Sequence, residues 1–87
     1  MVGFAIVGLG MGRNRAQQVI DTRGAELRMV VDLNARLAEE VAGKFGCDWT
    51  SNLEDALGRE DVDVVFILTP SGRELLDSHS DQTIIAL

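Results

Sequence analysis

Three glycines near the amino terminus have the spacing of a phosphate-binding turn. Gly8, Gly10 and Gly12 follow a continuous apolar run over residues 2–7 and precede a stretch with an amphipathic helical pattern. A glycine-rich turn between a strand and a helix lets the backbone approach a pyrophosphate, whose charge is met by N–H groups at the helix N-terminus. Glycine also serves tight turns that bind nothing. The glycines alone are therefore weak evidence for a nucleotide site.

A carboxylate lies where the ribose of a dinucleotide requires one. Asp32 ends the next apolar segment, 20 residues after Gly12, and an acid at this distance accepts hydrogen bonds from the adenosine ribose. Its charge would repel a 2′-phosphate, which favours NAD over NADP as the cofactor. Helix capping is the alternative role for Asp32. Arg36, one helical turn further along, could neutralise a phosphate, lie against the adenine or only face solvent.

The most strongly β-prone segment, residues 62–69, ends in a Thr-Pro pair. In the strand order expected for this fold, that strand lies beside the first one, and ligands bind between the carboxyl ends of the two. We therefore predict that Thr69 and Pro70 flank the cofactor, although a Thr-Pro pair also simply ends strands. The predicted cofactor-binding residues are Gly8, Gly10, Met11, Gly12, Asp32, Arg36, Thr69 and Pro70.

Alternating strands and helices must position these residues. Apolar patterning predicts strands at residues 2–7, about 26–31, 47–50 and 62–69, with helices at about 12–22 and 34–45. Gly46 follows the second helix, where a left-handed cap prefers glycine, and Ser51 with Glu54 fits the capping box of a short helix through about Leu57. This βαβ series predicts an α/β, Rossmann-like fold with a mostly parallel sheet, of which the chain would form about the first half.

Composition argues against several other functions. The 87 residues suffice for one small domain, and the formal charge of −6 opposes nucleic-acid binding. No apolar run approaches the ~20 residues that span a bilayer, and the apolar N-terminus has no basic leader, so we expect a cytoplasmic protein without membrane contact. The single cysteine, Cys47, argues against a disulfide framework and against a multi-cysteine metal site, and no metal is predicted.

The ordered motifs resemble those of the Gfo/Idh/MocA family, which comprises glucose-fructose oxidoreductase, inositol dehydrogenase and rhizopine-catabolism proteins. They are Ile6 to Ala16 around the glycines, Val30-Val31-Asp32, and Asp61 to Val65 running into Thr69-Pro70-Ser71. The resemblance covers about residues 2–73. It implies an N-terminal domain that binds NAD(P), in oxidoreductases that act on sugar-like and polyol substrates and bind them on a second α/β domain.

Several features depart from the family pattern. Gly12 comes one residue early, Arg15 stands where the family has a histidine, and Gly72 follows the Thr-Pro-Ser segment where a histidine is usual. The resemblance also implies a strand ending in Glu-Lys-Pro, whose lysine lies beside the reacting hydroxyl, and the sequence lacks it. Lys44, the single lysine, lies far from the strand ends, and His79 follows no motif. No catalytic residue is therefore assigned, and we expect a truncated member that holds NAD, with NADP possible, without turnover on its own.

Residues 74–87 do not share the resemblance and are predicted to form an atypical tail after a domain at 1–73. About 73–80 are long enough for two helical turns, and 83–87 are β-prone. The extra strand could pair in the same chain or in a partner's sheet. A small core gains most from the second arrangement, so we predict a homodimer through the tail and the edge of the strand ending at Thr69. The alternatives are a non-catalytic nucleotide-binding module and a self-associating scaffold.

Overall fold

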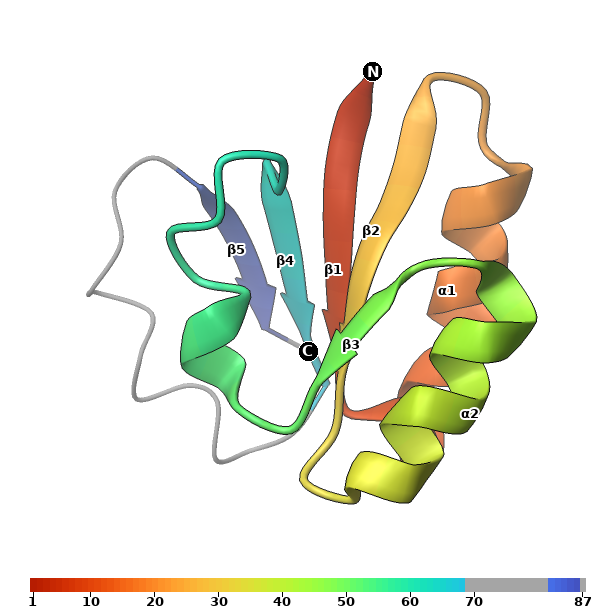
Figure 1. Cartoon of the computed structure of the whole chain (residues 1–87). Coiled ribbons are helices and arrows are strands. Elements are labelled where there is room, and N and C mark those ends of the chain that lie inside the picture. The colour runs from red at the N-terminus through yellow and green to blue at the C-terminus, as the bar shows by residue number, and fades with distance from the viewer. Residues whose placement is uncertain (69–81, 87) are drawn as a thin grey trace.

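The protein is built on a five-stranded parallel sheet with two helices against one face. The structure is a computed structural model and describes residues 1–68 and 82–86. The sheet order is β3-β2-β1-β4-β5, formed by β1 (Val2–Val7), β2 (Ala25–Val31), β3 (Asp48–Thr50), β4 (Val64–Ile67) and β5 (Thr83–Ala86). Helix α1 (Leu9–Asp21) joins β1 to β2, and α2 (Ala35–Phe45) joins β2 to β3 (Figure 1). The predicted Rossmann-like α/β architecture is confirmed.

Both faces of the central strands are buried, each in its own apolar cluster. Alternate residues of β1 point to opposite faces, so Ile6 packs against α1 and α2 while Ala5 and Val7 pack under the connection between β3 and β4. The same alternation places Val65 and Ile67 of β4 in the cluster that contains Ala5 and Val7. Burial on both faces explains why these strands read as continuous apolar runs in the sequence.

Helix α2 matches the prediction at both ends. The side chain of Asn34 accepts a hydrogen bond from the Leu37 N–H at 3.2 Å, which caps the first turn. Gly46 ends the helix in the left-handed region at φ 71°, where glycine has no steric penalty. The apolar stripe that predicted this helix lies against the sheet, with Ala38, Val41 and Ala42 buried.

Helix α1 begins earlier than its apolar stripe predicted. The helix starts at Leu9 instead of near Gly12, so Gly10 and Gly12 lie in its first turns. Leu9 is fully buried in the cluster under the helices, and this burial favours a helical start despite the poor helix propensity of the glycines that follow. The glycine-rich turn expected over Gly8 to Gly12 is therefore confined to Gly8.

The segment after β3 also differs from the prediction. It forms a 3₁₀ turn, η1 (Leu53–Asp55), capped by Asn52 rather than Ser51, and the Asn52 side chain accepts from the Glu54 N–H at 3.1 Å. The reason is a competing local network: Thr50 Oγ1 accepts from the Asn52 N–H at 3.1 Å and donates to Asp55 at 2.5 Å. Side chains that bond nearby backbone groups favour tight turns over helix. Strand β4 is likewise shorter than predicted, at Val64–Ile67.

The tail strand pairs within its own chain. β5 lies parallel to β4, in register from the Val64–Thr83 pair to the Ile67–Ala86 pair, so the favoured arrangement in a partner's sheet is not the one observed. Gln82 holds the start of β5 in place. Its side chain accepts from the Gly58 N–H at 2.9 Å and donates to the carbonyl oxygens of Ala56 at 3.0 Å and Val62 at 3.1 Å. The helix predicted at about 73–80 lies outside the described residues.

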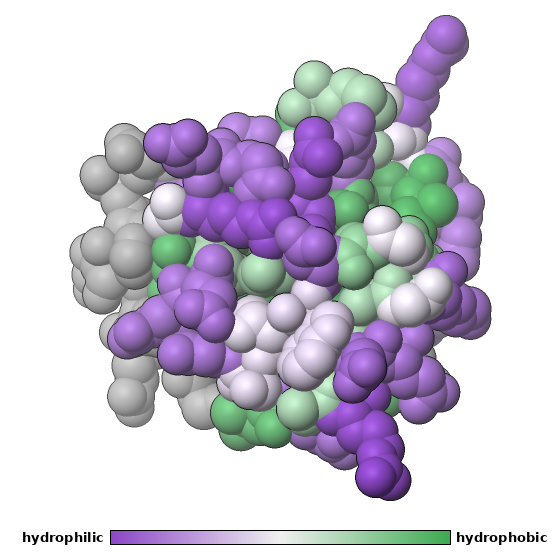
Figure 2. Space-filling view, viewed as in Figure 1, coloured by the Kyte–Doolittle hydropathy of each residue, from purple (hydrophilic) through white to green (hydrophobic). Residues whose placement is uncertain are grey.

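Acidic residues are concentrated in the connection between β3 and β4. Residues 48–63 contain six acids and one basic residue, Arg59. Arg59 donates to Asp48 at 2.6 Å and to Asp61 at 2.5 Å, which ties the start of β3 to the segment before β4. Hydrophilic side chains cover much of the face shown in Figure 2. Neither α1 nor α2, the helices of the described part, is long and apolar enough to cross a membrane.

Candidate nucleotide site

The turn between β1 and α1 consists of one buried glycine. Gly8 has φ 92° and ψ 83°, in a region that residues with a side chain rarely adopt. Its N–H donates to the Val31 carbonyl oxygen at 2.9 Å, so the end of β2 holds the turn. Because the turn is this tight, α1 starts directly at the carboxyl end of β1, where ligands of open parallel sheets bind.

At Gly10, in the first turn of α1, no side chain of the described residues lies close to the backbone. The second and third residues of a helix, here Gly10 and Met11, have no acceptor for their N–H groups within the helix. Gly10 is exposed, and a Cβ built on it would meet no described atom within 4 Å. The positive end of the helix is therefore open to an anion at this point.

The carboxylate of Asp32 lies against this turn. Asp32 follows β2 directly, is half-buried, and its Oδ2 accepts from the Leu9 N–H at 2.8 Å. Its Oδ1 accepts from the Asn34 N–H at 2.9 Å. The structure therefore brings together the acid and the glycine turn, which the sequence had linked by spacing alone. Asp32 does not cap α2, since Asn34 does.

Two of the other predicted cofactor-binding residues lie in the described helices. Gly12 lies in α1, and Arg36 is exposed on the first turn of α2. Thr69 and Pro70 lie outside the described residues. The strand that precedes them does end beside β1, because the Leu68 N–H donates to the Val7 carbonyl oxygen at 2.9 Å. The point at which the strand order reverses therefore lies between β1 and β4, next to Gly8.

Two backbone groups that hold the Asp32 carboxylate were not predicted from the sequence. The N–H groups of Leu9 and Asn34 hold both oxygens of the Asp32 carboxylate. The Asn34 contact had a local signal, because an aspartate often accepts from the N–H two residues further on in an Asx turn. The Leu9 contact joins residues 23 apart and had no such signal.

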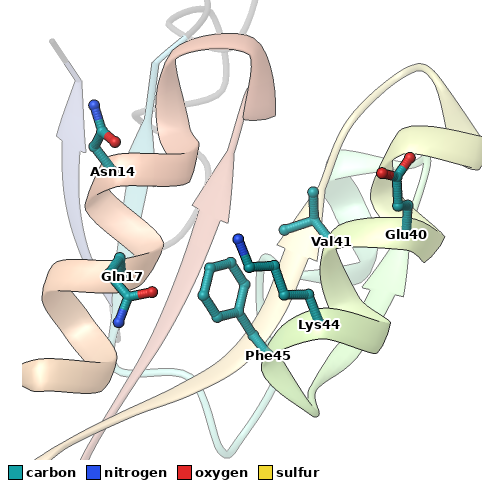
Figure 3. Close-up of a pocket in the computed structure, with 6 residues that line it drawn as sticks. All are labelled: Asn14, Gln17, Glu40, Val41, Lys44 and Phe45. Atoms are coloured by element: carbon teal, nitrogen blue, oxygen red, sulfur yellow. The ribbon is translucent and has the colours of Figure 1, made fainter.

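Lys44 lies away from this site. It comes near the end of α2, just before β3 begins, and the carboxyl ends of the strands are at the opposite edge of the sheet. Its ammonium lies 5.6 Å from the centre of the Phe45 ring. Figure 3 shows it with Phe45 beside a groove of about 380 Å³ between α1 and α2, which is also lined by Asn14, Gln17, Glu40 and Val41.

Cys47 is unsuited to nucleophilic or redox chemistry at neutral pH. Burial of the thiol, with a smaller contribution from Asp48, raises its pKa to about 11, although Arg59 opposes the shift. The thiolate is the reactive form, so very little of this cysteine is reactive near pH 7.

Comparisons with known proteins agree with this geometry. A family model described as "Oxidoreductase family, NAD-binding Rossmann fold" matches residues 2–87, further than the motifs alone reached. The chain is 31% identical over 86 residues to 4-carboxy-2-hydroxymuconate-6-semialdehyde dehydrogenase of Sphingobium sp., covering 97% of this chain and 26% of that protein. It thus spans about a quarter of the length of this relative.

Two solved structures share the fold. The first is myo-inositol dehydrogenase from Lactobacillus casei in complex with NAD(H) and myo-inositol, at a TM-score of 0.83 and 25% identity, with 99% of this chain and 28% of that chain covered. The second is GenD2 from gentamicin A biosynthesis in complex with NAD, at a TM-score of 0.84 and 27% identity, with 98% and 26% covered. The described sheet and helices therefore have the arrangement of two proteins crystallised with this cofactor.

Proposed function

The chain belongs to the oxidoreductase family with an NAD-binding Rossmann fold, and from this premise we propose that its glycine turn and Asp32 bind the adenosine diphosphate half of NAD. One observation carries the proposal: the Asp32 carboxylate lies 2.8 Å from the N–H of the first residue of α1. A ribose acceptor and the positive end of a helix therefore adjoin, as an adenosine diphosphate requires.

Each group has a defined part in binding. The N–H groups of Gly10 and Met11 would meet the pyrophosphate, with Gly8 and Gly12 keeping side chains out of its path. The remaining lone pairs of Asp32 would accept from the ribose hydroxyls. Arg36, Thr69 and Pro70 are proposed to lie along the adenosine and nicotinamide sides. Bound NAD would supply a hydride acceptor, and the residues of this chain would only orient it.

We further propose that the chain serves an oxidoreductase acting on sugar-like or polyol substrates. The support is that the similar structures are those of an inositol dehydrogenase and of a protein of gentamicin A biosynthesis. Because 26% of the Sphingobium relative is matched, the activity of a whole enzyme remains part of the proposal. We propose a cytoplasmic location, as expected from the sequence.

Calorimetric titration of the 87-residue chain with NAD, NADP and AMP tests the cofactor proposal. We expect NAD to bind with a dissociation constant between about 1 μM and 1 mM, because the secure part of the site orders one half of the dinucleotide. Binding of AMP as tight as that of NAD would favour the alternative of a mononucleotide module. No binding of any of the three would contradict the proposal.

The same preparation is expected to show no dehydrogenase turnover on polyols or sugars. A proton acceptor has to lie within hydrogen-bond reach of the reacting hydroxyl, and Lys44, the single lysine, lies at the far end of α2. NADH formation is followed by absorbance across the fractions of a final purification step. Activity that follows the protein peak at constant specific value would contradict this expectation.

Replacing Asp32 by asparagine should reduce the preference for NAD over NADP by about tenfold, the equivalent of one hydrogen bond to a charged group. The change removes the charge that repels a 2′-phosphate and weakens the ribose contact. Glu39→Gln is the matched control, because Glu39 is an exposed carboxylate on α2. An NAD-to-NADP affinity ratio that is the same in Asp32→Asn and Glu39→Gln would remove Asp32 from the site.

A homodimer remains a separate proposal. β5 is the last strand of the described sheet, and its sequence, Thr-Ile-Ile-Ala, contains no charged residue that would discourage pairing with another strand. Light scattering of the purified chain should then give twice the mass of one chain. Ile85→Asp places a charge on this strand and should yield monomer or unfolded protein. A variant that stays dimeric with an unchanged Tm would contradict dimerisation through the tail.

A further inference from the structure

We infer that Asp32 is also a positioning residue, which fixes the phosphate-binding turn itself in addition to accepting from the ribose. This inference rests on the proposed function of the same site. The observation behind it is that the two oxygens of one carboxylate have different partners. Oδ1 accepts from the Asn34 N–H in its own loop at 2.9 Å, and Oδ2 accepts from the Leu9 N–H at the start of α1 at 2.8 Å.

The turn needs such an external restraint because of its composition. Gly8 and Gly10 flank Leu9, and glycine restricts the backbone less than any other residue. Burial of the Leu9 side chain fixes one point of the turn. Among the described residues, the hydrogen bonds to its N–H groups come from the end of β2, where Val31 accepts from Gly8 at 2.9 Å and Asp32 accepts from Leu9.

Asp32 is itself held firmly enough to act as this restraint. Its backbone N–H donates to the Thr50 carbonyl oxygen at 3.3 Å, and Asn34, which binds Oδ1, begins α2 as its cap. The carboxylate is therefore anchored to β2, to the end of β3 and to the start of α2. A turn that is bound to it takes its position from two strands and one helix.

Charge alone would have the opposite effect on phosphate binding. A carboxylate close to a pyrophosphate repels it, so an Asp32 that acted only through its charge would weaken the binding of the phosphates. A positioning role strengthens their binding by fixing the N–H donors in advance. Two variants that both lack the charge, but differ in whether they can reach Leu9, separate these effects.

The test uses Asp32→Ser and Asp32→Asn with two probes, ADP and 2′,3′-dideoxy-ADP. The dideoxy compound has no ribose hydroxyls, so direct contact with residue 32 is removed and only the phosphates and the base remain. The serine hydroxyl can still accept from the N–H two residues further on, but it is too short to replace both oxygens. The asparagine side chain is long enough to place its one acceptor oxygen on the Leu9 N–H, and its NH2 group, which cannot accept, then faces the Asn34 N–H.

We expect Asp32→Ser to bind dideoxy-ADP about fivefold more weakly than Asp32→Asn does, the equivalent of one hydrogen bond of about 1 kcal/mol. Amide hydrogen exchange should show Leu9 protected in Asp32→Asn and unprotected in Asp32→Ser, with protection elsewhere unchanged. Equal affinity of the two variants for dideoxy-ADP, within twofold, would overturn the inference.

Two further outcomes distinguish failure of the inference from failure of the proposed function. If Asp32→Ser does not fold, amide hydrogen exchange of Leu9 is measured instead in the wild type without nucleotide. Exchange of Leu9 as fast as that of the exposed Gly10 would overturn the inference. Slower exchange of Leu9 would support it. If the wild type binds neither ADP nor NAD, the proposed function fails and the inference falls with it. Binding of ADP with equal affinities of the two variants for dideoxy-ADP overturns the positioning role alone.

Discussion

Gly10→Val is expected to abolish NAD binding while leaving the fold intact. A Cβ on Gly10 meets no described atom within 4 Å, so the described part of the chain leaves room for the first carbon of the new side chain. It does occupy the space in front of the first-turn N–H groups of α1, through which a pyrophosphate has to approach. We expect at least about a hundredfold loss of affinity by calorimetry, about 2.7 kcal/mol, with an unchanged circular dichroism spectrum.

Gly43→Val provides the matched control. Gly43 lies in α2, is exposed, and a Cβ built on it likewise meets nothing within 4 Å in the described part of the chain. The same substitution there has the same effect on helix propensity but lies away from the glycine turn. It should bind NAD as the wild type does. Wild-type affinity in Gly10→Val would show that the phosphates bind elsewhere.

Gly3→Ala is expected to destabilise the protein strongly. A Cβ on Gly3 would lie 1.9 Å from the carbonyl oxygen of Asp61, a separation that requires the backbone to move. That backbone is fixed by two bonds, since the Asp63 N–H donates to the Gly3 carbonyl oxygen at 2.7 Å and the Gly3 N–H donates to the Asp63 carboxylate at 2.8 Å. Separating β1 from this segment should cost at least about 3 kcal/mol of unfolding free energy.

Urea unfolding followed by circular dichroism measures this loss. A domain of this size has a stability of about 5 kcal/mol, so the variant should keep about 2 kcal/mol or less and unfold at a much lower urea concentration than the wild type. Gly43→Ala is the control, and it should gain up to about 1 kcal/mol because alanine favours the helix. A Gly3→Ala midpoint within experimental error of the wild type would mean that β1 does not lie against Asp61 as described.

The elements with strong local signals could be predicted from the sequence. Helix α2 has a capping asparagine, an apolar stripe and a terminal glycine, and these signals agree with one another. Strand β4 lies within the most strongly β-prone segment and is apolar on both faces, with Val65 and Ile67 in one cluster and Phe66 against the other. An element can be predicted reliably when its capping residues and its apolar pattern indicate the same structure.

Elements decided by competing contacts could not be predicted. Ser51 with Glu54 has the pattern of a capping box, but Thr50 and Asn52 bond the same backbone and close a tighter turn. The start of α1 depends on burial of Leu9, which the polar and glycine-rich neighbours conceal. Pairing of the tail depends on Gln82, whose partners lie 20 to 26 residues earlier in the chain.

In the candidate site too, one part could be predicted from the sequence and another depends on contacts between distant residues. Spacing placed Asp32 at the end of β2 near the glycine turn, because the topology of the fold determines that position. Which atoms its carboxylate binds follows from a contact over 23 residues, and no local pattern encodes it. The sequence could therefore indicate Asp32 as the candidate acid, but not its hydrogen bond with the Leu9 N–H.

The position of β1 between β2 and β4 has a consequence for the order of folding during synthesis. β1 pairs with β2 through nearby sequence, but its other edge pairs with β4, and the Gly3–Asp63 bond spans 60 residues. A nascent chain that has emerged from the ribosome only to about residue 60 can assemble β1, α1, β2, α2 and β3. Until β4 emerges, the first strand made keeps an open apolar edge on which another nascent chain can pair. Contacts over such separations also form slowly, so the centre of the sheet closes only after β1, β2 and β3 have been made.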